Sequence, residues 1–294
     1  MDNAKSDQLF RRVAIVGLGL LGGSWGLALK KARFKGRIVG YARRAETREQ
    51  ALREGAVDEA FADATEVVRG ADLVILATPV AVILDHLARL QPHVSPQALV
   101  TDVGSTKRRI CEQAAEHYAQ RPLFLGGHPM AGKERSGLEN ADAQLFQNAR
   151  YVMTPIKPEH LQDPRVQAFR ALVAAIGARS LTSDPETHDL AVAYLSHLPQ
   201  LLSSGLASLI EEKHTGEDLS LLLAATGFRD MTRLAESPYS IWRDICLTNI
   251  ENIQTALDAL TQKLESMKLH LSDRELEREF QQAARLRARL REMS

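Results

Sequence analysis

The sequence contains little cysteine and no excess of either charge. Its two cysteines, Cys111 and Cys246, belong to no CxxC or Cys/His motif. This excludes a disulfide scaffold and a cysteine-rich zinc site, and we expect no bound metal. Lysine plus arginine total 37, as do aspartate plus glutamate. Because nucleic-acid binding and polybasic membrane binding both need excess positive charge, we expect neither kind of partner.

Long apolar runs are also missing. No apolar segment approaches the ~20 residues that a helix needs to cross a bilayer. The opening stretch MDNAKSDQLFRR contains no apolar signal core, so a cytoplasmic location is expected. What remains is an ordinary globular composition, with 45% hydrophobic and 25% charged residues among 294. At roughly 100–200 residues per domain, this length suggests about two domains.

From residue 11 to residue 182, short β-branched runs alternate with helical patterns. A helix over 22–33 follows the first strand, and later helices are expected at 47–54, 80–90, 106–119 and 164–176. The expected strands are Arg12–Gly17, Arg37–Tyr41, Ala71–Ala77, Leu99–Val103, Leu123–Leu125, Tyr151–Pro155 and Ala178–Thr182. This alternation predicts βαβ units and therefore an α/β domain with a doubly wound, mostly parallel sheet.

Residues 183–294 show no convincing strand, so the second domain is expected to be all-helical. Helices are predicted over 186–212, 239–268 and 272–292. They carry more apolar surface than one small domain would bury alone, which favours a homodimer through this domain. The junction near residue 182 is short, so the two domains should share an interface, where small-molecule sites tend to lie.

The first strand leads directly into Gly17-Leu18-Gly19-Leu20-Leu21-Gly22, which opens the first helix. This strand, turn and helix are typical of a dinucleotide site. Gly17 permits the tight turn, Gly19 lets the backbone approach a pyrophosphate, and Gly22 lets helix and strand pack closely. The helix N-terminus adds free N–H groups. Thr78 and Pro79 follow the third strand and are expected to line the ribose of the cofactor.

The end of the second strand bears on the choice of dinucleotide. NAD enzymes usually place an acidic residue here to bind the ribose 2′-hydroxyl group. This chain has Arg43 and Arg44 instead, and the first acidic residue after the strand is Glu46. A guanidinium group binds a 2′-phosphate, whereas a carboxylate repels it. NADP is therefore favoured; if both arginines are merely solvated, the cofactor is NAD or either one.

Oxidation of an alcohol by nicotinamide needs a base, and histidine is the usual one because its pKa lies near neutrality. Among nine histidines, His128 stands out, because glycines flank it in the stretch LGGHPMAG just past a predicted strand. These glycines should allow close approach of a ligand. Ser105 follows another strand; it could bond to the reacting hydroxyl group, orient the histidine, or simply cap the next helix.

Three residues of the helical region are further candidates. His197 precedes Pro199, which should kink the helix, and a kink beside a histidine suggests a site rather than a packed core residue. Arg233 could bind a substrate carboxylate with Asp230 as its partner, or form only a surface ion pair. Trp242 could line the same pocket or pack in the dimer core.

Together these motifs resemble the prephenate/arogenate dehydrogenase family of tyrosine biosynthesis. The match runs over about residues 11–270 and rests on these motifs, in this order: GLGLLGGS, DLVILATPV, TDVGSTK, GGHPMAG, SHLP, GFRDMTRLA and IWRDI. Many families share GxGxxG, but GGHPMAG followed by SHLP and GFRDMTR is specific. The resemblance implies a Rossmann-type domain over 11–182, an all-helical dimerisation domain over 183–294, and an active site between them.

The resemblance also implies a reaction, the oxidative decarboxylation of prephenate or arogenate to 4-hydroxyphenylpyruvate or tyrosine with hydride transfer to NAD(P)⁺. By motif position, His128 is implied as the base and Ser105 as its hydrogen-bonding helper. His197 is implied as a contact to the substrate side chain and Arg233 as a carboxylate binder. Lys133 stands where family members often have threonine; it could meet a substrate carboxylate or face solvent.

Two alternatives remain open at this stage. Another two-domain NAD(P)-dependent dehydrogenase, of the β-hydroxyacid or imine type, would share the architecture. The β-hydroxyacid type would need a catalytic lysine on the helix over 186–212, which contains none. A non-catalytic dinucleotide sensor would need the glycine turn, but not Ser105, His128, His197 and Arg233 together. Prephenate and arogenate both remain candidate substrates, because they differ only by a keto group and an ammonium group.

Overall fold

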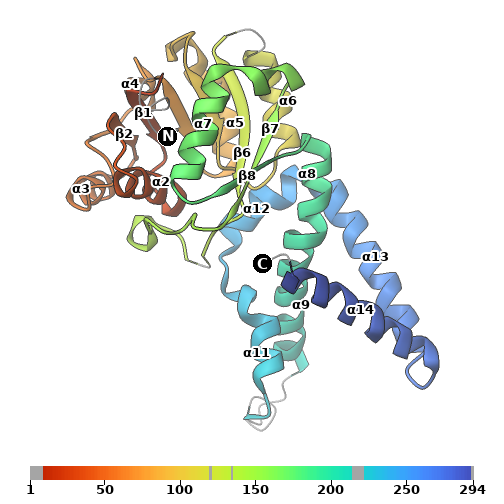
Figure 1. The fold of residues 1–294 in the computed structure, drawn as a ribbon. Coiled ribbons are helices and arrows are strands. Elements are labelled where there is room, and N and C mark those ends of the chain that lie inside the picture. The colour runs from red at the N-terminus through yellow and green to blue at the C-terminus, as the bar shows by residue number, and fades with distance from the viewer. Residues whose placement is uncertain (1–8, 119–120, 134, 214–221, 293–294) are drawn as a thin grey trace.

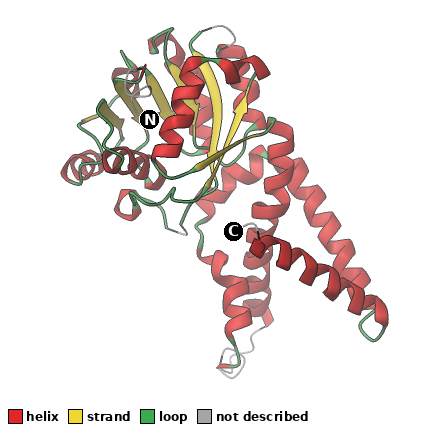
Figure 2. Cartoon of the chain, viewed as in Figure 1, coloured by secondary structure: helices red, strands yellow, loops and turns green. Residues whose placement is uncertain are grey.

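The computed structural model describes residues 9–118, 121–133, 135–213 and 222–292. Figure 1 shows an α/β part followed by a helical part that extends away from it. The first part contains an eight-stranded sheet, and no strand occurs in the described residues of the second (Figure 2). The predicted fold class is confirmed.

The sheet has the strand order β3-β2-β1-β4-β5-β6-β7-β8. Its strands are β1 (Arg12–Val16), β2 (Arg37–Tyr41), β3 (Glu59–Phe61), β4 (Leu73–Leu76), β5 (Leu99–Asp102), β6 (Leu123–Pro129), β7 (Arg150–Pro155) and β8 (Arg179–Thr182). Only the β6–β7 pair is antiparallel. Because β1 lies between β2 and β4, the winding reverses there, and in open α/β sheets ligands bind at the carboxyl edge at such a point.

Apolar cores cover both faces of the sheet, which explains why β4 and β5 are buried throughout. The helices of this part are α2 (Leu20–Lys31), α3 (Ala45–Arg53), α4 (Ala64–Val68), α5 (Val80–Leu90), α6 (Arg108–His117) and α7 (Pro164–Ala175), with short turns η1 (Gln91–His93), η2 (Leu138–Asn140) and η3 (Pro158–Gln162). On one face, Trp25 of α2 stacks on Phe169 of α7 with ring centroids 5.8 Å apart. On the other, α4, α5 and α6 supply the apolar side chains.

The helical part begins with α8 (Pro185–Val192), one π-helical turn η4 (Ala193–His197) and α9 (Leu198–Lys213). Pro199 lacks an N–H group and would clash with the carbonyl group of Leu195, so the wide turn before it relieves this conflict. Where a kink was predicted beside His197, the structure has this π-helical turn. The remaining elements are α11 (Thr226–Thr232), η5 (Arg233–Glu236), α12 (Tyr239–Thr248), α13 (Ile250–Leu269) and α14 (Arg274–Glu292).

Two buried aspartates of the helical part hold it against the α/β part. Asp189 of α8 accepts hydrogen bonds from the backbone N–H groups of Lys107 and Arg108, at 2.7 and 2.9 Å. Asp244 of α12 accepts one from Ala81 N at 3.1 Å. These carboxylates cap the N-termini of α6 and α5 from outside, where the helix dipole favours negative charge. The carboxyl edge of the sheet is thereby fixed against the helical part.

Several predicted boundaries were wrong. Strand β6 continues to Pro129, four residues beyond its predicted end, because β7 pairs with its extension. The predicted helix over 239–268 is two helices separated at Asn249, whose backbone leaves the helical conformation. Helix α6 begins at Arg108, and residue 119 of its predicted span lies outside the described residues. The short elements β3, α4 and α11 were not predicted, because a few residues carry little periodicity.

The last strand ends at Thr182 and the helical part begins at Pro185. The division into domains at residues 182 and 183 stays a prediction, and residues 214–221 and 293–294 lie outside the described ones. Among the helices described, none is long and apolar enough to cross a membrane. The cytoplasmic location also stays a prediction.

Candidate active site

A cavity of about 390 Å³ lies between the two parts of the chain. The α/β part contributes Ser105, from the β5–α6 loop, and the stretch from His128 to Lys133. The helical part contributes residues of η4, α9, η5 and α12, including His197, Gln200 and Trp242. The structure thus brings five predicted site residues to one cavity: Ser105, His128, Lys133, His197 and Trp242.

A buried ion pair near Ser105 in the chain links the end of β5 to β6. Lys107 pairs with Asp102, and both side chains are fully buried. Asp102 also accepts from the N–H groups of Gly104 and Gly127, at 2.7 and 3.0 Å, and Lys107 Nζ donates to Gly127 O at 2.7 Å. Ser105 does not cap α6, because Lys107 stands at the N-cap position and Asp189 supplies the cap. The capping role considered for Ser105 is therefore wrong.

His128 lies inside β6, opposite Val152 of β7, and not in a loop beyond the strand. The glycines before it serve the packing of strands. A Cβ atom at Gly127 would lie 2.5 Å from Asp102 O, and one at Gly126 would overlap the Thr154 hydroxyl group. The expectation that these two glycines admit a ligand was wrong, whereas Gly132, after the histidine, faces open space and lines the cavity. A rigid strand surrounded by this packing holds the histidine instead.

The His128 ring is buried and its environment opposes a positive charge. Its Nδ1 lies 2.9 Å from Nε2 of His188, a buried residue of α8. Burial is the main cause that lowers the pKa of His128 well below its ordinary value of 6.5, and the positive charge of Lys107 acts in the same direction. The imidazole is therefore neutral near pH 7, as a proton acceptor must be.

His197 faces the same cavity from η4 and is also neutral, because burial lowers its pKa to about 4. Its Nδ1 lies 3.3 Å from Asn249 Nδ2, and its ring meets the Trp242 ring edge-on with centroids 5.9 Å apart. Trp242 in turn donates from Nε1 to Ser237 Oγ at 2.9 Å. His197 and Trp242 thus belong to one packed wall of the cavity.

The two predicted cationic groups differ in position. Lys133 lines the cavity, but its Nζ donates to Asn140 O at 3.0 Å and lies 3.4 Å from Asp142 Oδ2. Arg233 is exposed at the start of η5, and within the described residues the cavity is lined by its neighbour Leu234 instead. The structure does not bring Arg233 to the cavity of a single chain, so its role stays a prediction.

Sequence reasoning missed several residues of this region. Gln200 lines the cavity, and its Nε2 donates to Leu234 O at 2.8 Å. His188, Asp189 and Asn249 lie behind the two cavity histidines. For His188 and Asp189, the sequence offered one signal, a His-Asp pair in the first turns of a predicted helix. Such a pair is also common at the solvent-exposed start of a helix.

The dinucleotide turn has the geometry that its glycines predict. Gly17 has φ +109°, and a Cβ atom there would lie 2.7 Å from Ala77 O. A Cβ atom at Gly22 would overlap Gly17 O, whereas Gly19 faces open space. No side chain among the described residues caps α2, so its first N–H groups face the turn. The buried Thr78 hydroxyl group, adjacent to Gly17, has no partner in the described chain, and these groups together fit a pyrophosphate and a ribose.

Arg43 and Arg44 lie exposed between β2 and α3. Their loop is held by Arg48, a residue that sequence reasoning missed, which donates from Nη1 to the carbonyl oxygens of Ala42 and Arg43, both at 2.8 Å. The loop is therefore ordered, and the two guanidinium groups remain in solvent at the end of β2.

Comparison with known proteins identifies the family to which the chain belongs. Residues 25–182 match the nucleotide-binding domain of prephenate dehydrogenase, and residues 184–286 match its dimerization domain. The chain belongs to the prephenate dehydrogenase family. The resemblance inferred from the motifs is confirmed.

Relatives within this family cover nearly the whole chain. A prephenate dehydrogenase of Bacillus subtilis is 35% identical over 93% of this chain and 74% of its own length. The arogenate dehydrogenase of Synechocystis is 33% identical, with TM-score 0.79, and the match covers 95% of this chain and 99% of that one. The prephenate dehydrogenase of A. aeolicus, in complex with hydroxyphenyl propionate and NAD⁺, is 30% identical with TM-score 0.85, covering 97% and 98%.

Proposed function

We propose that the chain oxidises and decarboxylates prephenate, arogenate or both, with a nicotinamide dinucleotide as the oxidant. The observation that carries this proposal is the cavity between the two parts of the chain, which Ser105, His128 and His197 line together. The names of the relatives support the same chemistry, since they include prephenate and arogenate dehydrogenases. A dinucleotide sensor would have no use for a buried, neutral histidine in this cavity.

In this proposal, His128 accepts the proton of the substrate hydroxyl group as the ring carbon that bears this group loses a hydride. The nicotinamide ring, when bound, supplies the oxidation by accepting this hydride. The bond from the opposite ring carbon to the carboxylate then breaks and carbon dioxide leaves. The electron pair of the broken bond enters the ring, which becomes aromatic. The ring oxygen, now a phenolate, regains a proton. Ser105 donates a hydrogen bond to the reacting oxygen, and His197 contacts the substrate side chain. Positioning and proton removal suffice, since aromatisation drives the step.

NADP is proposed as the preferred cofactor. Arg43 and Arg44 support it, since two exposed guanidinium groups stand where a carboxylate would bind the ribose of NAD. Leu20 and Leu21, in the first turn of α2, supply backbone N–H groups to the pyrophosphate, and Pro79 lies with Thr78 beside the ribose. Replacing both Arg43 and Arg44 by alanine should raise the KM for NADP⁺ and leave that for NAD⁺ unchanged. An equal effect on both cofactors would contradict this assignment.

Binding of the substrate carboxylates is proposed for Arg233, with Lys133 as a second cation at the cavity. A guanidinium group binds a carboxylate through two parallel hydrogen bonds, whereas an ammonium group acts as a point charge. Arg233→Lys and Lys133→Met should therefore each raise the substrate KM, the former more, with the dinucleotide KM unchanged. Wild-type substrate KM in both variants would remove both residues from the site.

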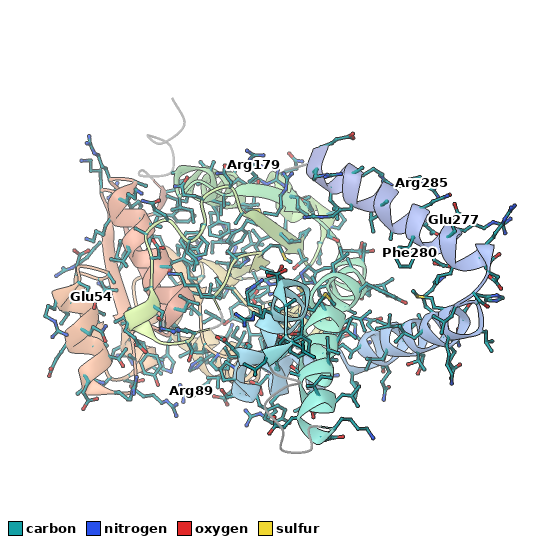
Figure 3. All side chains as sticks on the ribbon, turned by 90° about the horizontal axis from the view of Figure 1, so that it is seen from below. Glu54, Arg89, Arg179, Glu277, Phe280 and Arg285 are labelled. Atoms are coloured by element: carbon teal, nitrogen blue, oxygen red, sulfur yellow. The ribbon has the colours of Figure 1, made fainter. Side chains whose placement is uncertain are left out.

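A homodimer through the helical part is proposed as the assembly. No described residue of α14 is buried in the single chain, and a groove of about 730 Å³ lies between α13 and α14. Figure 3 shows Phe280 projecting from α14 into the space between these helices. Exposed apolar side chains on this scale mark an interaction surface, and the match to a dimerization domain favours a second copy as the occupant.

Steady-state assays test the activity most broadly. Prephenate and arogenate are each combined with NAD⁺ and NADP⁺, and dinucleotide reduction is followed by absorbance. Turnover is expected with at least one substrate, faster with NADP⁺. A β-hydroxyacid and a cyclic amine serve as controls for the other dehydrogenase types. Turnover of a control alone, or dinucleotide binding without any turnover, would refute the proposed function.

A further inference from the structure

Asp189 is fully buried and receives three hydrogen bonds on its carboxylate. Two come from the backbone N–H groups of Lys107 and Arg108, and the third joins Oδ1 to His188 Nδ1 at 2.7 Å. Each of its oxygens already accepts from a backbone N–H group, which can only donate, so the carboxylate is the acceptor toward His188 as well. His188 Nδ1 must therefore carry a hydrogen atom.

The hydrogen atom on His188 Nδ1 in turn determines which nitrogen of His128 carries hydrogen. A neutral imidazole has one N–H donor and one acceptor nitrogen, so a neutral His188 with hydrogen on Nδ1 has a bare Nε2. That Nε2 lies 2.9 Å from His128 Nδ1, which must then be the donor. The other nitrogen of His128, Nε2, is left as a bare acceptor. This is the form in which the ring can take a proton.

A second path from Asp189 leads to His197. The backbone carbonyl group of Asp189 is only an acceptor, and Asn249 Nδ2 donates to it at 2.8 Å. This fixes which end of the amide is nitrogen. The same nitrogen lies 3.3 Å from His197 Nδ1, which must accept. In the neutral ring the hydrogen atom is then on Nε2, and His197 is a donor there.

We propose that Asp189 is a positioning residue that sets the two cavity histidines in opposite tautomers. Through its carboxylate and His188, it makes His128 Nε2 an acceptor; through its carbonyl group and Asn249, it makes His197 Nε2 a donor. The use of this pair rests on the proposed function: the acceptor takes the hydroxyl proton and the donor binds an oxygen of the substrate side chain. The same carboxylate caps α6, so the tautomers are tied to the docking of the two parts.

The alternative to this proposal is a His188 ring that carries hydrogen on both nitrogens. If His188 carried hydrogen on both nitrogens, His128 Nδ1 would have to accept, and His128 Nε2 would carry the hydrogen atom. His128 could then not act as a base. The two cases differ in an observable way, because the imidazole tautomers have distinct ¹⁵N chemical shifts.

Nuclear magnetic resonance of the full-length protein with ¹⁵N-labelled histidine tests the assignment without any substrate. Signals are assigned with His128→Gln and His197→Gln variants at pH 7.5. The expected result is hydrogen on Nδ1 for His128 and on Nε2 for His197. Hydrogen on Nε2 of His128, or a doubly protonated His188, would overturn the proposal. A protein without dehydrogenase activity but with these tautomers would refute only the proposed function.

A pair of variants at His188 separates positioning from structure. In His188→Gln, the amide can still donate toward Asp189 and accept from His128, so kcat should stay within about tenfold of the wild-type value. His188→Leu lacks the acceptor, so kcat should fall by about 10²–10⁴-fold, the contribution of a general base, with the dinucleotide KM unchanged. Equal losses in both variants would show a structural role only.

Discussion

At the residue scale, the completely buried ion pair of Lys107 and Asp102 is the most consequential interaction in the α/β part. Removing one partner of a buried pair leaves an uncompensated charge, which costs about 3–5 kcal/mol. Lys107→Ala should lower the free energy of unfolding by that amount. Arg109→Ala, which removes an exposed pair with Glu112 on the same helix, should cost about 0–1 kcal/mol. Urea unfolding of both variants checks this, and similar costs would contradict it.

The pH dependence of catalysis is a second prediction at this scale. The base must be neutral, and the pKa of His128 lies well below 6.5, so the active form should persist as the pH falls through 6.5. The acid limb of kcat/KM, which reports the free enzyme, is therefore expected below pH 6.5. A limb centred at or above 6.5 would contradict it. The groups that face His128 are His188 of α8, Lys107 before α6, and His197 of η4.

Residues with chemistry of their own could be predicted, and their partners could not. His128 and His197 stand in short distinctive motifs, so sequence reasoning found both. Their partners His188 and Asn249 are 60 and 52 residues away along the chain, and only the docking of α8 and α13 brings them near. The glycines before His128 were found but misinterpreted, because a packing glycine and a ligand-facing glycine look alike in a sequence.

At the element scale, the turn between β1 and α2 predicts opposite behaviour for two of its glycines. Gly19 faces open space with an ordinary φ of −95°, so Gly19→Ala should fold normally while its methyl group obstructs the pyrophosphate. We expect the dissociation constant for the dinucleotide to rise by about tenfold or more, or ~1.4 kcal/mol. In Gly22→Ala the Cβ atom overlaps Gly17 O, so stability should fall instead.

Thermal unfolding and dinucleotide titration distinguish these two variants. Loss of stability in Gly19→Ala, with unimpaired binding, would show that the open space is not the pyrophosphate site. Most elements around this turn could be predicted, because their apolar runs are long and periodic. The element boundaries could not, since the extension of β6 depends on β7 and the break at Asn249 depends on contacts with α8 and η4.

At the scale of the whole molecule, the helical part leaves apolar surface exposed. Phe280 and Leu286 on α14 are 65% and 56% exposed, and both line the groove between α13 and α14. If a second copy covers them, Phe280→Glu and Leu286→Glu should each convert the dimer into a monomer. Leu52→Glu, at an exposed leucine on α3, serves as the control. Light scattering measures the mass; a wild-type monomer would contradict the dimer.

The architecture of two successive parts could be predicted because strand and helix periodicities differ clearly on either side of residue 182. The arrangement of the parts could not, since it depends on Asp189 and Asp244 capping helices more than 80 residues away. Arg233 shows the same limit: its motif suggested a substrate contact, yet the single chain leaves it away from the cavity lining.

The whole proposal depends on His128, the cavity histidine of β6, acting as the base. The most direct measurement compares kcat of His128→Gln with that of the wild-type protein, for the substrate and dinucleotide that react fastest, alongside the dissociation constant for the dinucleotide. We expect a fall in kcat of about 10²–10⁴-fold with unchanged dinucleotide binding. A variant that binds the dinucleotide and turns over at the wild-type rate would contradict it.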